Sequence, residues 1–257
     1  MKRQNIIILV TVLLGIFSVI YSLSVSSQES SVWMNKGDAL WEERGDVRKV
    51  EEAINAYTRI LETDPENYEA NWKITRAYFL LGDMLDEIRE NRKRHKELGK
   101  EGMRYGKKAF ELNPEGVEGH YYYGLCLAKY TLGISFITAL TGGIASKYET
   151  HMEGALEINK DYDSAGPLRA LGRYWHKIPW PKRDLKKSIA YLEEAVARAP
   201  MNIRGRCYLA EAYLKAKKKK LAKEQLEIAS SSPVDLREEI SAQRWKEKAG
   251  TLLKENF

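Results

Sequence analysis

Small and apolar residues recur along the chain at helical spacing, and each full recurrence ends at a proline. Two copies share one spacing throughout: Ala53, Tyr57, Ile60 and Pro65, and then Ser188, Leu192, Ala195 and Pro200. Small residues let two antiparallel helices approach closely, and proline ends the second helix because it has no N–H for the helical ladder. The pattern predicts an all-α, right-handed α-solenoid of about five tetratricopeptide-like hairpins, with units of about 34 residues.

The same register places the individual hairpins. The first pairs a helix through Trp33, Gly37 and Leu40 with a helix over residues 53–60. The second unit begins at residues 68–83 and the third at residue 118, while the fourth spans 164–200 and the fifth 202–233. A final amphipathic helix over residues 236–254 is expected to cap the array, because the end of a repeat stack needs a polar outer face.

Two stretches depart from the repeat. Residues 84–99 are charged and helix-forming, so they are expected to lengthen the helix or to add one. Residues 131–146 carry no charge and interrupt an apolar run with glycines. That run is too short to span a bilayer and too apolar for an exposed loop. A buried helix, the inner wall of a cavity and an oligomer contact all fit this apolar stretch.

The chain begins with a segment that is set apart from the repeats. Lys2 and Arg3 precede an uncharged run over residues 5–28, which is apolar from residue 6 to residue 20. A charged start followed by an apolar run is typical of a signal peptide, and a run of this length also spans a bilayer uncleaved. We therefore expect residues 1–27 to be a signal peptide or an N-terminal membrane anchor, and residues 28–257 to be an exported, periplasmic repeat domain.

Charge, cysteines and histidines narrow the class of function. The net charge is +6, which does not demand a nucleic-acid partner, and basic clusters at residues 89–96 and 217–220 are most often solvated faces. Contact of these clusters with anionic lipid is a weaker alternative. Cys126 and Cys207 lie in different repeats, where burial or a disulfide would fit. No catalytic or metal-binding motif surrounds the four histidines, so we predict neither an enzyme nor a cofactor.

Stacked hairpins bind partners on the concave face formed by the first helix of each unit. The register predicts that face to carry the binding residues Trp72, Arg76, Phe79, Tyr121, Leu125, Arg169, Arg173 and His176. The set combines aromatic side chains with three arginines and hardly any acid. It predicts an apolar ligand with an acidic group, or an acidic segment of a protein partner. Pairing of these arginines with neighbouring carboxylates is an equally weighted alternative.

The fourth unit contains the most specific stretch, which runs from Gly166 to Pro181. Its defining positions are Gly166, Pro167, Arg169, Leu171, Gly172 and Pro179. The stretch resembles the TatT-like T component of tripartite ATP-independent periplasmic (TRAP) transporters. That resemblance implies a periplasmic homotrimer that works beside a solute-binding protein, with Arg169 in a polar role. The expected function is an accessory ligand- or partner-binding component, and the alternative is a general envelope scaffold for protein–protein interactions without a small ligand.

Overall fold

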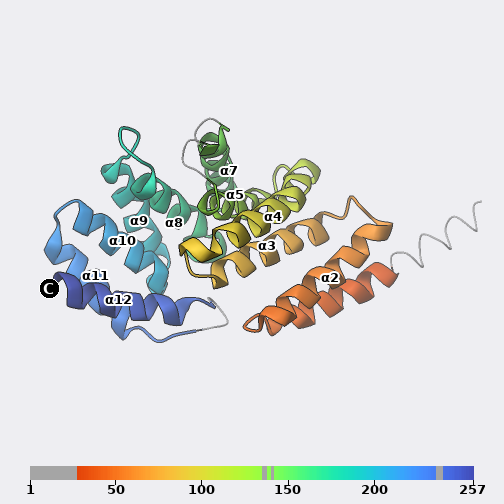
Figure 1. The fold of residues 1–257 in the computed structure, drawn as a ribbon, viewed down its shortest axis with the longest axis horizontal. Helices are drawn as coiled ribbons and strands as arrows, with labels where there is room; N and C mark the ends of the chain where they lie inside the picture. Colours follow the sequence, from red (N-terminus) through yellow and green to blue (C-terminus); the bar gives the residue numbers. More distant parts are fainter. Residues whose placement is uncertain (1–27, 135–137, 140–141, 236–239) are drawn as a thin grey trace, which may run out of the picture.

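The computed structural model describes residues 28–134, 138–139, 142–235 and 240–257, and in these ranges the chain forms a curved stack of antiparallel helical hairpins (Figure 1). The first hairpin joins a helix over residues 28–42 to α2 (Val47–Thr63), and the second joins α3 (Tyr68–Met84) to α4 (Arg92–Leu112). The third pairs α5 (Val117–Leu132) with α7 (Ile144–Ile158), and the fourth pairs α8 (Tyr162–Lys177) with α9 (Leu185–Arg198). The fifth pairs α10 (Ile203–Lys215) with α11 (Lys219–Ser231), and α12 (Ala242–Asn256) packs on it as a cap. The predicted α-solenoid is confirmed.

A proline followed two residues later by an asparagine links one hairpin to the next at two places in the chain. Pro65 and Pro200 follow the ends of α2 and α9, and Asn67 and Asn202 come two residues later as the N-caps of α3 and α10. Each asparagine side chain accepts a hydrogen bond from the backbone N–H three residues further on, at 2.9 and 2.8 Å. The first N–H groups of a helix have no partner within the helix, so this bond favours the start of a new one. This proline–asparagine pair therefore fixes where the second and the fifth hairpins begin.

Small residues allow the helices to pack closely, as the repeat pattern predicts. A Cβ on Gly172 would lie 2.4 Å from Cγ of Leu192, which joins α8 closely to α9. A Cβ on Gly99 would lie 2.4 Å from the backbone nitrogen of Tyr130, so α4 meets the backbone of α5 directly. The segment after α3 contains a short 3-10 turn, η1 (Arg89–Asn91), and then runs into a long α4. The extra residues thus lengthen the second hairpin, which is one of the two predicted outcomes.

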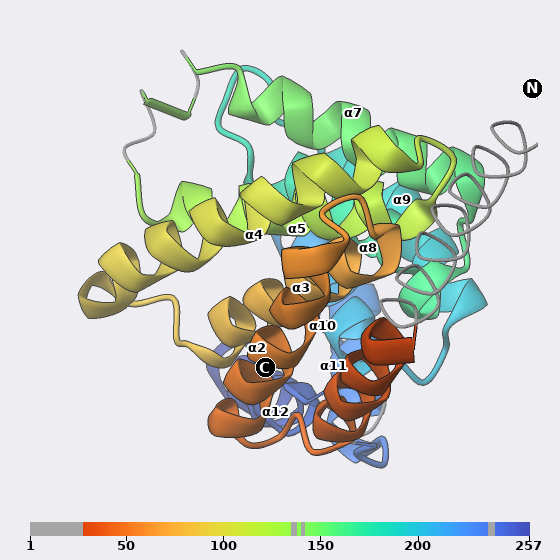
Figure 2. The same ribbon diagram turned by 90° about the vertical axis from the view of Figure 1, so that its right-hand side faces the viewer.

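The array curls so that its late helices return to an early one. Figures 1 and 2 both show α7 along the upper edge of the molecule and α12 along the lower edge. Arg244 of α12 donates a hydrogen bond to the backbone oxygen of Asp83 at the end of α3, across 161 positions of sequence, at 2.7 Å. Arg204 of α10 reaches the carboxylate of the same residue across 121 positions. The curl thus brings α10 and α12 back to the end of α3.

The described residues bear on three expectations from the sequence: the membrane span, the apolar stretch and the two cysteines. Within the described ranges, no helix is both long and apolar enough to cross a membrane. The expected signal peptide or anchor, residues 1–27, lies outside those ranges, as do residues 135–137 and 140–141 of the apolar stretch and residues 236–239 before the cap. Cys126 and Cys207 are fully buried free thiols, which decides against a disulfide between them.

Candidate functional site

A cavity of about 500 Å³ lies inside the arc of helices. Its wall comes from the end of the first helix, from α3, α5, α7, α8 and α10, and from α12 with the residues just before it. Eight basic residues and three acidic residues line it, together with a larger number of apolar ones. A concave, largely apolar site of this size with a few convergent polar groups is the usual form of a ligand-binding pocket. The excess of positive charge favours an anionic occupant.

The apolar part of the wall comes mainly from α5, α7 and α8. Its larger members are Leu125, Leu132, Ile144, Tyr148, Tyr174 and Ile178. The rings of Tyr148 and Tyr174 stack with their centroids 5.2 Å apart, and the Tyr148 hydroxyl donates to the backbone oxygen of Ala170. Five of the described members of the apolar stretch, residues 131–132, 139 and 144–145, belong to this wall. For these residues the cavity-wall interpretation is confirmed.

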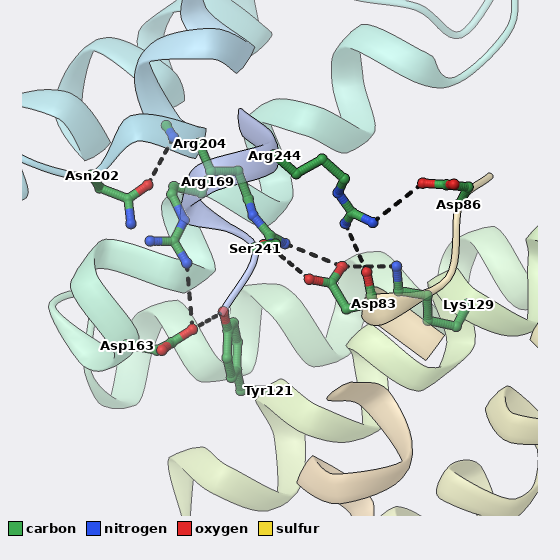
Figure 3. A network of polar contacts seen from close by, with 11 residues as sticks. Asp83, Asp86, Tyr121, Lys129, Asp163, Arg169, Asn202, Arg204, Ser241 and Arg244 are labelled. Atoms are coloured by element: carbon green, nitrogen blue, oxygen red, sulfur yellow. Dashed lines mark hydrogen bonds and ion pairs between the residues drawn. The ribbon is translucent and has the colours of Figure 1, made fainter. Parts of the chain in front are cut away.

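Asp83 gathers positive side chains from three parts of the chain at the cavity wall (Figure 3). Lys129 Nζ lies 2.9 Å from Oδ1, and Arg204 Nη2 lies 2.5 Å from Oδ2. Burial alone would raise the pKa of Asp83, but Arg204 and Lys129 outweigh burial and hold that pKa well below its usual range. The carboxylate therefore stays ionised and ties α3, α5 and α10 together.

A second polar group begins α8. Asp163, Ser164 and Ala165 have positive φ angles of 50°, 55° and 59°, a left-handed conformation that side chains adopt only at a cost. Arg169 holds this turn, because its guanidinium donates to the Ser164 backbone oxygen at 2.9 Å and to the Asp163 carboxylate at 3.4 Å. Tyr121 donates to the same carboxylate at 2.6 Å (Figure 3). Burial, followed by the Asp163 charge, raises the pKa of Tyr121 well above its usual value.

A third ion cluster lies between α8, α10 and α12. Arg173 pairs with Glu211, and Lys248 Nζ lies 2.8 Å from the other carboxylate oxygen. Burial would raise the pKa of Glu211, but Arg173 and Lys248 together lower it to about 2. Arg173 also lies over the ring of Tyr208, 4.3 Å from its centroid. This cluster joins the cap to the cavity wall.

Arg76 differs from the other arginines of the cavity. Its guanidinium carbon lies 3.8 Å from the ring centroid of Trp41 and 4.9 Å from that of Trp72. Its buried Nε has no hydrogen-bond partner, and no carboxylate of the described residues lies within ion-pair distance of it. Stacking on aromatic faces stabilises a guanidinium while its N–H groups stay directed along its own plane. Arg76 thus offers the cavity an arginine that no carboxylate of the described ranges engages.

Six of the eight predicted binding residues line the cavity: Arg76, Phe79, Tyr121, Leu125, Arg169 and Arg173. Trp72 instead stacks on Tyr122, with an angle of 8° between the rings, and its own ring lies against the guanidinium of Arg76. His176 is buried in the last turn of α8, where the charges of Glu211 and Lys215 on α10 act on it. Burial, followed by Arg173, lowers the pKa of His176 to about 4. The register therefore fails at Trp72, which packs on α5, and at the end of α8, where the turn lies over a neighbouring helix.

The expectation that the lining holds hardly any acid is wrong. Asp83, Glu87 and Asp163 line the cavity, and Glu211 pairs with Arg173 at its edge. The alternative that the arginines pair with carboxylates holds for Arg169 and Arg173. These acids escaped the sequence reasoning because Asp83, Asp163 and Glu211 lie on first helices at positions that the register did not consider, and Glu87 lies in the segment after α3. The partners Arg204 and Arg244 meet Asp83 only through the curl of the array, and no local signal marks them.

Comparison with known proteins identifies relatives and structural neighbours. The family model "Regulator of microtubule dynamics protein 1-3" matches residues 33–179, more than half of the chain. Regulator of microtubule dynamics protein 1 of Pongo abelii is 24% identical over 218 residues, which cover 78% of this chain and 66% of that protein. The human protein of the same name is 25% identical over 189 residues, covering 67% and 58%. The chain thus spans less than two-thirds of the length of these two relatives.

Two solved structures show the same fold at low sequence identity. A tetratricopeptide-repeat protein of Thermus thermophilus superposes with a TM-score of 0.62 at 16% identity, covering 88% of this chain and 99% of that one. MamA from Desulfovibrio magneticus superposes with a TM-score of 0.53 at 15% identity, covering 78% and 93%. Both likenesses support a tetratricopeptide-like scaffold, a fold that presents a concave surface to partners.

The resemblance to the TRAP transporter T component is wrong, because the matched family is a different one and its model includes the same motif residues from Gly166 to Pro179. The structure explains why the motif misled. A Cβ on Gly166 would lie 2.3 Å from the Tyr121 hydroxyl, and Gly172 meets Leu192 as closely. These glycines serve helix packing, and a shared packing solution does not carry a shared function. The chain belongs to the Regulator of microtubule dynamics protein 1-3 family.

Proposed function

We propose that this chain is a non-enzymatic interaction scaffold whose cavity binds an acidic group next to apolar side chains, presented by a protein partner. The observation that carries the proposal is Arg76, an arginine of the cavity wall that stacks on Trp41 and Trp72 and has no carboxylate of the described residues within ion-pair distance. An incoming carboxylate can pair with it without displacing an ion pair among these residues. Charge-assisted hydrogen bonds to arginine are among the stronger polar contacts.

The apolar wall supplies the second half of the recognition. Phe79 and Leu125 lie on the same wall as Arg76, and Tyr148 and Tyr174 extend it towards α7 and α8. Apolar side chains of a partner would bury themselves there while the acid group meets the arginine. A free amphipathic acid has the same chemistry, since it also joins a carboxylate to an apolar body. The experiment must therefore separate these two sources.

The test is a fluorescence-anisotropy titration of the full-length protein with a labelled peptide of alternating glutamate and leucine. The same peptide with lysine in place of glutamate is the charge control. We expect Arg76→Gln to weaken binding of the acidic peptide by about tenfold or more, the usual loss for a charge-assisted contact. Arg59→Gln is the matched variant, since Arg59 is an exposed arginine of α2 that pairs with Glu62 away from the cavity.

Competition with dodecanoate then distinguishes the two sources of the acid group. Displacement of the peptide by dodecanoate but not by dodecanol means that a free amphipathic acid shares the site. Peptide binding that resists dodecanoate supports the protein partner alone. The proposal is overturned by equal affinities for the acidic and basic peptides, or by an Arg76→Gln variant that binds like the Arg59→Gln variant.

The name of the relatives supports a second, separate proposal, that the partner of this chain belongs to a microtubule. Because the chain aligns with only 66% and 58% of two such relatives, the role does not transfer without a test. Co-sedimentation of the full-length protein with polymerised tubulin provides one, with Arg76→Gln as the variant. Sedimentation of the protein at the same low level with and without tubulin polymer would refute it.

A further inference from the structure

Two histidines meet in the third hairpin, and neither of them lines the cavity. His120 lies in the first turn of α5 and His151 in the middle of α7, and their Nδ1 atoms are 3.1 Å apart. Both side chains are half-buried. The two ring planes are tilted by 44° with their centroids 5.0 Å apart, so the rings do not lie head to head in one plane. Because 31 positions separate the two residues, no local spacing in the sequence marks the pair.

The neighbours of this pair determine where its protons lie. Nε2 of His120 is 3.0 Å from the backbone oxygen of Pro114. A carbonyl oxygen only accepts hydrogen bonds, so Nε2 of the neutral ring carries the proton and Nδ1 keeps a free lone pair. Burial, followed by the charges of His120 and Lys147, lowers the pKa of His151 to about 4, so this ring is neutral at pH 7. His151 then donates from Nδ1 to His120, and a shift of that proton to Nε2 of His151 leaves two lone pairs at the contact.

The separation of the two Nδ1 atoms is that of two nitrogens that bind one metal ion. Zn²⁺ binds imidazole nitrogen at about 2.0–2.1 Å, so two such nitrogens at the corners of a square or a tetrahedron lie about 2.8–3.4 Å apart. The observed 3.1 Å falls within this range. Histidines that bind metals usually donate their other ring N–H to a carboxylate or a backbone carbonyl. His120 already does so at Pro114.

The surroundings leave space at the two nitrogens. Gly154 of α7 lies beside them, and a Cβ there would be 3.0 Å from Nδ1 of His120. Phe110 of α4 packs against the ring of His151, with the centroids 4.5 Å apart, and so limits its rotation. Lys147 is exposed, so water and salt screen its repulsion of a cation. Within the described ranges, no group of three or more His, Cys, Asp or Glu side chains is placed to hold a metal ion, so water or a group of a partner would complete the coordination.

We propose that His120 and His151 bind one divalent transition-metal ion of the class that prefers imidazole, Zn²⁺ or Cu²⁺, through their Nδ1 atoms. The ion replaces the hydrogen bond between the rings, and the proton of that bond moves to Nε2 of His151. Since α5 and α7 each supply one ligand, the ion links the two helices of the third hairpin. The same α7 supplies Ile144 and Tyr148 to the cavity wall. Metal binding therefore stabilises a hairpin that forms part of the cavity.

The test is a titration of the untagged full-length protein with Cu²⁺, which binds nitrogen sites more tightly than Zn²⁺ does. Calorimetry should show one site, and electron paramagnetic resonance at one equivalent should show splitting by two nitrogens. His120→Gln and His151→Gln should each weaken binding by about 10- to 100-fold and remove one nitrogen from the spectrum. His176→Gln is the matched control, because His176 is buried in the last turn of α8, and it should keep the affinity and the spectrum. Excess Zn²⁺ should displace Cu²⁺, whereas Mg²⁺, which prefers oxygen ligands, should not.

Thermal unfolding provides a second readout. Cu²⁺ should raise the melting temperature of the parent but not that of the His120→Gln/His151→Gln variant, because only the parent binds the ion in its folded state. A parent spectrum without nitrogen splitting would overturn the proposal, whether or not the variants fold. So would a splitting by two nitrogens that survives both substitutions, or a loss of affinity in His176→Gln as large as in His120→Gln.

Discussion

Replacing Asp83 with asparagine should destabilise the protein far more than an ordinary surface change. Its side chain is 9% exposed, and those of Lys129 and Arg204 are 9% and 13% exposed. The variant keeps the shape of the side chain but leaves two buried cations without their anion. Removing one partner of a buried ion pair costs about 3–5 kcal/mol, because the remaining charge stays desolvated. That is a large share of the roughly 5–15 kcal/mol that stabilises a typical domain.

The measurement is urea-induced unfolding followed by circular dichroism. Asp46→Asn is the matched control, because asparagine still caps α2 and the ion pair lost, with Arg48, is exposed. Its expected effect is only a small fraction of the loss at Asp83, since water screens an exposed pair. Adding Lys129→Met to Asp83→Asn should recover part of the loss, since one uncompensated cation is removed. A loss below about 1 kcal/mol for Asp83→Asn would refute the view that this cluster closes the array.

Two further predictions concern pH and packing. Burial, followed by His120 for His151 and by Arg173 for His176, lowers the pKa of both histidines from 6.5 to about 4. The folded state takes up these protons less readily than the unfolded chain, so the free energy of unfolding should fall as the pH drops from 6.5 towards 4. Urea titrations of a His151→Gln/His176→Gln variant should show a smaller fall in the free energy of unfolding over the same pH range. Gly99→Ala should lower the free energy of unfolding by about 1–3 kcal/mol, because the new Cβ meets the backbone of α5. Gly250→Ala on α12, where nothing lies within 4 Å, should raise it by about 0.5–1 kcal/mol, and a loss of equal size in both variants would contradict this packing argument.

The parts of this fold that depend on neighbouring residues were predictable from sequence. The spacing that ends at Pro65 and Pro200 marks helix ends, and Asn67 and Asn202 cap the helices that follow. Periodicity of this kind also predicts which positions of a first helix face the concave side, which places Arg76 correctly. Local chemistry therefore determines the hairpins and most of the face that they present.

Features that depend on the curvature of the whole stack were not predictable. Arg204 and Arg244 reach Asp83 across 121 and 161 positions, and the small rotation between hairpins that brings them together has no local signature. The same limit explains the error at His176, whose turn lies over α10. The motif around Gly166 failed for another reason: its small residues are required by contact with Tyr121, and any array with that close approach can carry them.

The ion clusters of the cavity indicate that its arginines have two different roles, internal structure and ligand binding. Arg169 holds a left-handed turn and Arg173 joins α8 to α10, so the charge of each already pairs with a carboxylate of the protein. An external anion would have to compete with an internal one at these positions and leave that carboxylate buried and unpaired, which is costly. At Arg76 the guanidinium rests on tryptophan rings instead. Binding there removes no ion pair among the described residues, so substitution of Arg76 should change affinity, whereas substitution of Arg173 should first change stability.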